Sequence, residues 1–170
     1  MKTKILFFAV VLLFCLPKTT NAQVNVQDSL ALIALYNSTD GPNWTIPWPI
    51  TFPIEYWSGI SVINNRVVGL SVYGFGLSGN IPPEIGTLTE LTQLSLGQNH
   101  LSGNIPVELF NLVNLESLIL NENQLQGEIP HEIGNLINLQ ALSLHDNFLM
   151  GELPVELYQL TNLMILNINI

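Results

Sequence analysis

A strict 24-residue period from Val67 onward constrains the fold of this chain more than any other feature. Four complete repeats and an incomplete fifth have the bounds 67–90, 91–114, 115–138, 139–162 and 163–170. Leucine, glycine, proline and asparagine return in fixed columns, such as Leu94, Leu118 and Leu142. Such a period is typical of solenoids, in which each repeat forms one coil and buries its apolar side against neighbouring coils.

Each repeat opens with the pattern Leu-x-x-Leu-x-Leu, as at residues 115–120, and its last three residues alternate as a short strand does. One strand per coil predicts a parallel sheet. Columns of glycine and proline then turn the chain, because glycine adopts conformations closed to other residues and proline cannot continue a sheet. The second half of a repeat, such as residues 132–136, is expected to close the coil in a short helical or 3₁₀ turn on the convex side.

The segments Leu-Ser-Gly-Asn-Ile-Pro at 101–106 and Leu-Gln-Gly-Glu-Ile-Pro at 125–130 resemble the plant-type subclass of leucine-rich repeats. This subclass is found in plant receptor ectodomains and in secreted bacterial proteins. The resemblance implies an α/β solenoid with a parallel sheet on the concave face, short 3₁₀ or helical turns on the convex face, and an N-terminal helical cap. It also implies a second small sheet formed by the Gly-x-Ile-Pro segments.

Residues 23–66 resemble the N-terminal cap of this family, and residues 67–170 form the repeats. The cap elements are an amphipathic helix at 28–36, the segment 39–44 and a Trp-Ser-Gly-Ile element at 57–60. A cap is needed because the first coil would otherwise expose its apolar end. We expect Asn64 and Asn65 to form a hairpin turn into the first repeat strand.

Plant receptors usually flank the Trp-x-Gly-Val element of this cap with a pair of cysteines, whereas this chain has Glu55 and Val62 there. The cap is therefore expected to depend on the packing of Trp44, Trp48 and Trp57. This departure favours a secreted bacterial protein over a plant receptor.

Residues 1–22 have the features of a secretory signal peptide. Lys2 and Lys4 precede an apolar run at 5–16, and the small residue Ala22 lies at the predicted cleavage point. The only cysteine, Cys15, lies in this run, so a mature chain would have no disulfide. The predicted location is extracellular, either secreted or at the cell surface.

The mature chain would be strongly acidic. It would keep Arg66 as its only Lys or Arg against 13 Asp and Glu, which gives a net charge of −12. Nucleic acids and anionic lipids need arrays of basic side chains, so we predict no nucleic-acid partner and no membrane insertion of the mature chain. Leu163, Leu166 and Ile168 occupy core columns without a following coil, which predicts a truncated or fragment chain with an uncovered, self-associating end.

The outward positions of the repeat strands change from coil to coil, whereas the core columns do not. We therefore predict a ligand-binding concave face that includes Tyr73, Gln98, Asn121, Glu122, His145 and Asp146. An aromatic anchor beside polar and acidic groups is typical of protein interfaces. The predicted function is recognition of a protein or peptide, with a receptor-kinase ectodomain fragment, or a glycan-adhesive or structural surface protein, as alternatives.

Other patterns are interpreted as structural, and no catalytic residue, metal site or cofactor is predicted. The asparagine column, Asn99, Asn123 and Asn147, is expected to hydrogen-bond buried backbone groups of the turns. The glutamate column, Glu84, Glu108, Glu132 and Glu156, is expected to lie at the start of the convex turns, where free backbone N–H groups favour a negative charge. Ser143, His145 and Asp146 supply the residue types of a hydrolase triad, but adjacent strand residues are expected to point apart. Asn37 and Asn43 begin glycosylation sequons that matter only in a eukaryotic source.

Overall fold

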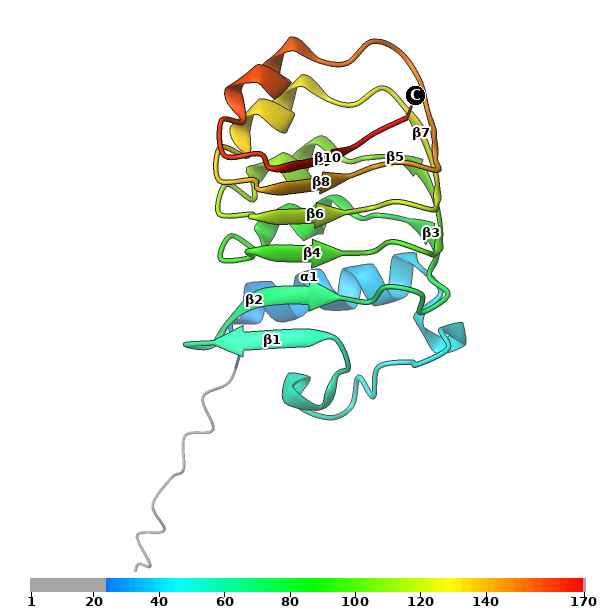
Figure 1. Cartoon of the computed structure of the whole chain (residues 1–170). Coiled ribbons are helices and arrows are strands. Elements are labelled where there is room, and N and C mark those ends of the chain that lie inside the picture. Colours follow the sequence, from blue (N-terminus) through cyan, green and yellow to red (C-terminus); the bar gives the residue numbers. More distant parts are fainter. Residues whose placement is uncertain (1–23, 170) are drawn as a thin grey trace, which may run out of the picture.

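A computed structural model describes residues 24–169, and the predicted signal peptide lies outside these residues. The chain winds into coils that are stacked on a helical N-terminal segment (Figure 1). Each coil contributes one strand to a sheet on one side and a 3₁₀ turn on the opposite side. The leucine-rich-repeat fold class predicted from the sequence is thereby confirmed.

The main sheet has the strand order β1-β2-β4-β6-β8-β10. Its strands are β1 (Ile60–Ile63), β2 (Arg66–Ser71), β4 (Gln93–Ser95), β6 (Ser117–Ile119), β8 (Ala141–Ser143) and β10 (Ile165–Asn167). From β2 onward they are parallel, and Leu70 lies beside Leu94, which lies beside Leu118. The register therefore advances by one sequence repeat per strand. Every leucine column stacks in the core for this reason.

A second sheet runs along the edge of the coils in the order β3-β5-β7-β9. Its strands are β3 (Ser78–Asn80), β5 (His100–Asn104), β7 (Gln124–Gly127) and β9 (Phe148–Leu149). This is the sheet that the family resemblance implied for the Gly-x-Ile-Pro segments. The proline that follows each strand then begins a convex turn; these 3₁₀ turns are Pro83–Thr87, Val107–Asn111, His131–Asn135 and Val155–Gln159. Glu84, Glu108, Glu132 and Glu156 lie in the first turns, as expected.

The asparagine column joins one coil to the next through the core. The side chain of Asn123 donates to the carbonyls of Leu96, Leu120 and Asn121 at 3.0–3.2 Å and accepts from the amide of Leu101 at 2.9 Å. Asn99 and Asn147 make the same kind of bonds in their own coils. The structural role predicted for this column is confirmed.

A second asparagine column connects the coils at the opposite corner, and the sequence analysis did not identify it. The amides of Asn114, Asn138 and Asn162 donate to the carbonyls of Thr89, Val113 and Ile137 in the preceding coil, at 2.8–2.9 Å. These amides are exposed, so each bond contributes less to stability than one in the core. The coils are thus tied at both ends of each strand of the main sheet.

A left-handed residue ends each strand segment on the concave side. It is Gly74 in the first coil and Gln98, Glu122 and Asp146 in the next three, with φ between 53° and 70°. The amide of Glu122 donates to the carbonyl of His145 at 2.9 Å, and its carbonyl accepts from Asn99 at 3.1 Å. Because all four coils share this conformation, the left-handed turn belongs to the repeat itself.

The N-terminal cap is built on helix α1 (Val26–Ser38), which Asn25 caps. Its inner face packs on an aromatic cluster in which the ring centroids of Trp44 and Trp48 are 4.8 Å apart and those of Trp48 and Trp57 are 5.1 Å apart. Each indole N–H donates to a backbone carbonyl at 2.8–3.0 Å. This confirms the prediction that the three tryptophans hold the cap, since aromatic packing supplies a large buried area.

The cap is joined to the first coil by contacts at both ends of β2. Asn64 and Asn65, both with positive φ, form the predicted hairpin turn between β1 and β2. Phe75 occupies the position that asparagine holds in later coils and packs against the core. Its carbonyl accepts from the amide and hydroxyl of Thr45 at 2.7 and 3.0 Å, so Phe75 also contacts the cap.

An ion pair that the sequence analysis missed also joins α1 to β2. Asp28 is fully buried, and both of its carboxylate oxygens accept from Arg66 at 3.0 and 3.1 Å. The amide of Val67 donates to the same carboxylate at 2.8 Å. The hydrogen bond with Asp28 raises the pKa of Arg66 above its ordinary value. Arg66, the only Lys or Arg of the predicted mature chain, is therefore engaged in an ion pair within the fold.

The last coil leaves apolar side chains exposed at the other end of the stack. Among them, Tyr158 and Met164 are 90% and 76% exposed, and Leu166 of β10 is 48% exposed. Leu163 and Ile168 are partly buried against the core. The apolar end expected from the incomplete fifth repeat is present in the fold.

We expect Asn123→Ala to lower the free energy of unfolding by about 1–3 kcal/mol, because buried backbone groups in two coils lose their partners. Urea melts of the variant and the parent chain measure this. Gln124→Ala is the control, since its side chain is exposed and makes no hydrogen bond within residues 24–169. Equal losses of unfolding free energy in the two variants would contradict a structural role for the Asn99, Asn123 and Asn147 column.

Arg66→Met should destabilise the chain by about 3–5 kcal/mol, because it leaves the Asp28 carboxylate buried without a counter-charge. The double variant Asp28→Leu/Arg66→Met should lose less than the sum of the two single variants. Glu90→Gln removes only a half-exposed partner, 3.6 Å from Arg66, and should cost about 0–1 kcal/mol. Thermal or urea unfolding of all four variants gives the coupling; additive losses would show that the ion pair does not join the cap.

The left-handed turn predicts a difference between two substitutions at one position. Gln98→Val should be about 1–2 kcal/mol less stable than Gln98→Gly, because a β-branched side chain is strained at positive φ and glycine is not. Both variants lose the same side-chain amide, so each serves as the control for the other. Equal urea midpoints would mean that the turn changes conformation easily.

Candidate ligand-binding face

The outward residues of the main sheet form an open face on which most side chains are small. Many of these strand positions carry small side chains, among them Ser71, Ser95, Ser117, Ala141 and Ser143, whereas Gln93, Ile119 and Ile165 are larger. The predicted site residues follow at the carboxyl ends of the strands. They project from the turns that the left-handed residues create.

Tyr73 lies over the second coil and not straight out into solvent. A Cβ atom added at Gly97 would be 2.8 Å from the Tyr73 ring and 2.7 Å from the Asn121 amide oxygen. Gly97 therefore leaves the space in which these two side chains lie. Tyr73 is 40% exposed, and its hydroxyl makes no hydrogen bond within the part of the chain that the structure describes.

Three predicted site residues form one hydrogen-bonded group around a carboxylate. Gln98 donates to one oxygen of Glu122, and Asn121 donates to the other, both at 3.0 Å. Asn121 is only 5% exposed. The sequence analysis expected it to face solvent, and this expectation is wrong because Asn121 is packed over Gly97 and bonded to Glu122. Its amide positions Glu122 and is not itself open to a ligand.

His145 and Asp146 lie together on the last complete coil. The Ser143 hydroxyl is 2.9 Å from His145 Nδ1, and Asp146 is 3.8 Å from His145 Nε2. The sequence analysis expected adjacent strand residues to point apart; they meet because Asp146 has the left-handed conformation. Ser143 is buried, so this chain of contacts holds the imidazole in place and does not present the hydroxyl as a nucleophile.

The structure thus brings Gln98, Asn121 and Glu122 together, with Tyr73 beside Asn121, and it brings His145 to Asp146. Two further contributors were not among the predicted site residues. They are Gly97, an outward position of its coil, and Asn169, whose amide donates to Asp146 at 3.4 Å. Among residues 24–169 no group of three acidic, histidine or cysteine side chains is placed to hold a metal. Within the same residues no helix is long and apolar enough to cross a membrane.

Comparisons with known proteins agree with this architecture. Residues 90–112, 114–136 and 138–160 match the family model described as Leucine Rich Repeat. The ectodomain of BIR2 from Arabidopsis thaliana is 35% identical with a TM-score of 0.76, and the match covers 85% of this chain and 79% of that one.

Two ligand-bound receptor structures are also similar. The ectodomain of the receptor kinase GASSHO1/SCHENGEN3 from Arabidopsis thaliana, in complex with CASPARIAN STRIP INTEGRITY FACTOR 2, is 36% identical with a TM-score of 0.75. The match covers 81% of this chain and 17% of that one. The plant peptide hormone receptor RGFR1, in complex with RGF2, is 36% identical over 63% of this chain and 20% of its own, with a TM-score of 0.52.

Among curated proteins, a probable inactive receptor kinase of Arabidopsis thaliana, At1g48480, is 39% identical over 95 residues. That match covers 54% of this chain and only 14% of the receptor kinase. These relatives are plant proteins, which conflicts with the bacterial origin predicted from the missing cysteines. Together, the stacked coils, the two asparagine columns and these matches show that the chain belongs to the leucine-rich repeat family, with receptor ectodomains among its relatives.

Proposed function

We propose that this chain is an extracellular recognition module that binds a protein or peptide ligand on the concave face of its main sheet. The observation that carries the proposal is the 40% exposed Tyr73 ring beside Asn121, whose amide donates to the Glu122 carboxylate on the same face. An aromatic side chain fixed at low entropic cost is a typical energetic anchor in interfaces. The proposed contact residues are Tyr73, Gln98, Glu122, His145 and Asp146, with Asn121 in a supporting role.

The electrostatics of this face favour a ligand with a basic group. Glu122 and Asp146 lie on the face, whereas Arg66 is paired with Asp28 at the cap. Glu122 is already oriented by two amide donors, so a ligand cation would meet a carboxylate held in one position. Charge complementarity of this kind contributes to the association rate and to specificity.

The relatives support a binding role. RGFR1 is a plant peptide hormone receptor in complex with RGF2, and the GASSHO1/SCHENGEN3 structure is the ectodomain of a membrane receptor kinase in complex with CASPARIAN STRIP INTEGRITY FACTOR 2. A signal peptide at residues 1–22 would direct such a module out of the cell. We propose no catalytic role for Ser143, because its hydroxyl is buried and lies 2.9 Å from His145 Nδ1.

A second candidate is that the chain is the ligand-binding part of a larger receptor. The match to the receptor kinase At1g48480 favours this reading, since the chain spans 14% of that protein's length. The same concave face would serve in either context. A glycan-binding role remains the alternative that a carbohydrate-array screen of the secreted chain would reveal.

Selection of random peptides displayed on phage against the secreted chain tests the proposal. Selected peptides should be enriched in Lys and Arg, and calorimetry should show that Tyr73→Ala, Glu122→Ala and Asp146→Ala each weaken binding by about 1 kcal/mol or more. Added salt should weaken it further. Glu84→Ala and Glu132→Ala, on the convex turns, are the matched controls. Loss of binding in the controls, with the concave variants unchanged, would refute this location.

A further inference from the structure

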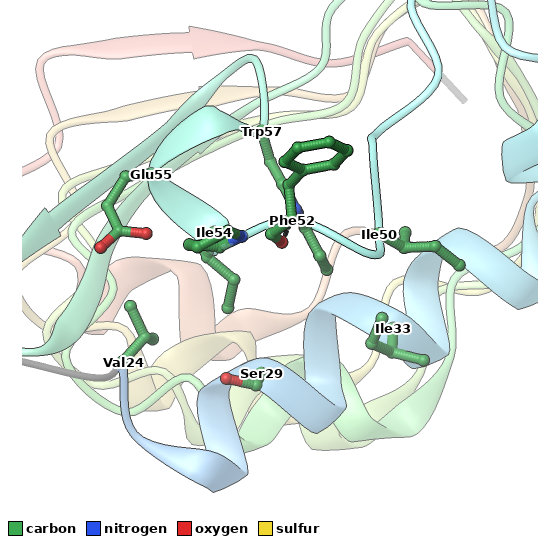
Figure 2. A pocket seen from close by; sticks show the side chains of 9 residues that line it. Val24, Ser29, Ile33, Ile50, Phe52, Ile54, Glu55 and Trp57 are labelled. Carbon is green, nitrogen blue, oxygen red and sulfur yellow. Dashed lines mark hydrogen bonds between the residues drawn. The ribbon is translucent and has the colours of Figure 1, made fainter. Parts of the chain in front are cut away.

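A half-open cavity of about 460 Å³ lies in the N-terminal cap, away from the concave face. Figure 2 shows α1 on one side, carrying Ser29 and Ile33, and the segment with Ile50, Phe52 and Ile54 on the other. Trp57 and Val24 complete the walls. The volume lies within the range of small-molecule sites.

The walls of this cavity are apolar, and its mouth is open to solvent. Val24, Ile54 and Trp57 are buried, whereas Ile50 and Phe52 at the entrance are 43% and 61% exposed. Side chains that line an unfilled space lack dispersion partners on that side, so an apolar occupant would supply contacts that the cap itself does not. A ligand would therefore place its apolar part between Ile33 and Trp57.

The polar groups at the cavity decide the charge of that ligand. Glu55 is the one ionisable side chain among the lining residues, and its exposed carboxylate has no hydrogen-bond or ion-pair partner within residues 24–169. The Ser29 hydroxyl already donates to the Asn25 carbonyl at 3.1 Å. The side chains that line the cavity thus offer acceptors and no free donor, in a chain that carries a formal charge of −9. An anionic ligand would be repelled.

We propose that this cavity is a second binding site, for a small cationic amphiphile: an aromatic or branched aliphatic group that carries a primary ammonium. The apolar group fills the space between α1 and residues 50–57, and the ammonium pairs with Glu55. Glu55 is exposed, so the ion pair contributes modestly, and the apolar contacts supply most of the affinity. The site shares no residue with the concave face and does not depend on the function proposed for that face.

A titration with 3-phenylpropylamine, 3-phenylpropan-1-ol and 3-phenylpropionate tests this site. The three probes share the apolar part and differ in charge. The indole N–H of Trp57, which donates to the Phe52 carbonyl at 3.0 Å, gives the readout in proton–nitrogen NMR spectra of the secreted chain. At low ionic strength the amine should bind about three- to fivefold more tightly than the alcohol, and the carboxylate most weakly.

Two variants separate charge from shape. Glu55→Gln should reduce the affinity for the amine to that for the alcohol, and Ser29→Phe should abolish binding of both by filling the space. Glu84→Gln, on a convex turn, is the charge-matched control and should change nothing. The proposal is overturned if Trp57 does not shift with any probe, if the alcohol or the carboxylate binds as tightly as the amine, or if Glu55→Gln leaves the preference for the amine intact. Circular dichroism melts confirm that each variant is folded.

Discussion

The mutual burial of one leucine column on the next is the constraint on which the rest of this structure depends. A single coil has no core of its own; Leu94 is fully buried only because Leu70 and Leu118 lie on either side of it. Stability is therefore passed from neighbour to neighbour along the stack. The first coil needs a different partner, and α1 with its aromatic cluster is that partner.

Burial of leucines fixes the distance between coils, but it does not fix the register of one coil on the next. Hydrogen bonds and the Asp28–Arg66 ion pair fix this register. Each core asparagine accepts from an amide of the preceding coil and donates to carbonyls of that coil and of its own, so a slipped register would leave buried amides unpaired. The Asp28–Arg66 pair does the same for the cap, because its carboxylate accepts from the first residues of β2. Because these bonds stack the coils, most outward side chains of the main sheet are not needed for stability; Asn121, which is buried, is an exception.

The two proposed sites differ because they arise from different parts of this design. The concave face is repeated from coil to coil, so its character comes from the few residues that break the repetition, Tyr73 and Glu122 above all. The cap cavity is unique in sequence and lies where a helix meets an irregular segment, at which packing leaves space. A flat surface with oriented carboxylates suits an extended ligand, whereas a half-open apolar cavity suits a compact one.

The sequence by itself determined the solenoid, its main sheet, the convex turns and the inward asparagines, because the 24-residue period assigns each column one environment in every coil. The second sheet was expected only from the resemblance to the plant-type repeats. The sequence also indicated the tryptophan-based cap and the hairpin at Asn64. Only the tertiary structure decided that Asp28 pairs with Arg66, 38 residues away, since no periodicity relates the cap to the first coil. The same holds for Asn121, whose burial depends on the absence of a side chain at Gly97 in the coil before it, and for the contact of His145 with Asp146, which a left-handed backbone turn brings about. Pattern determines which side of a coil a residue occupies, but the neighbours that cover it there are set by packing between coils.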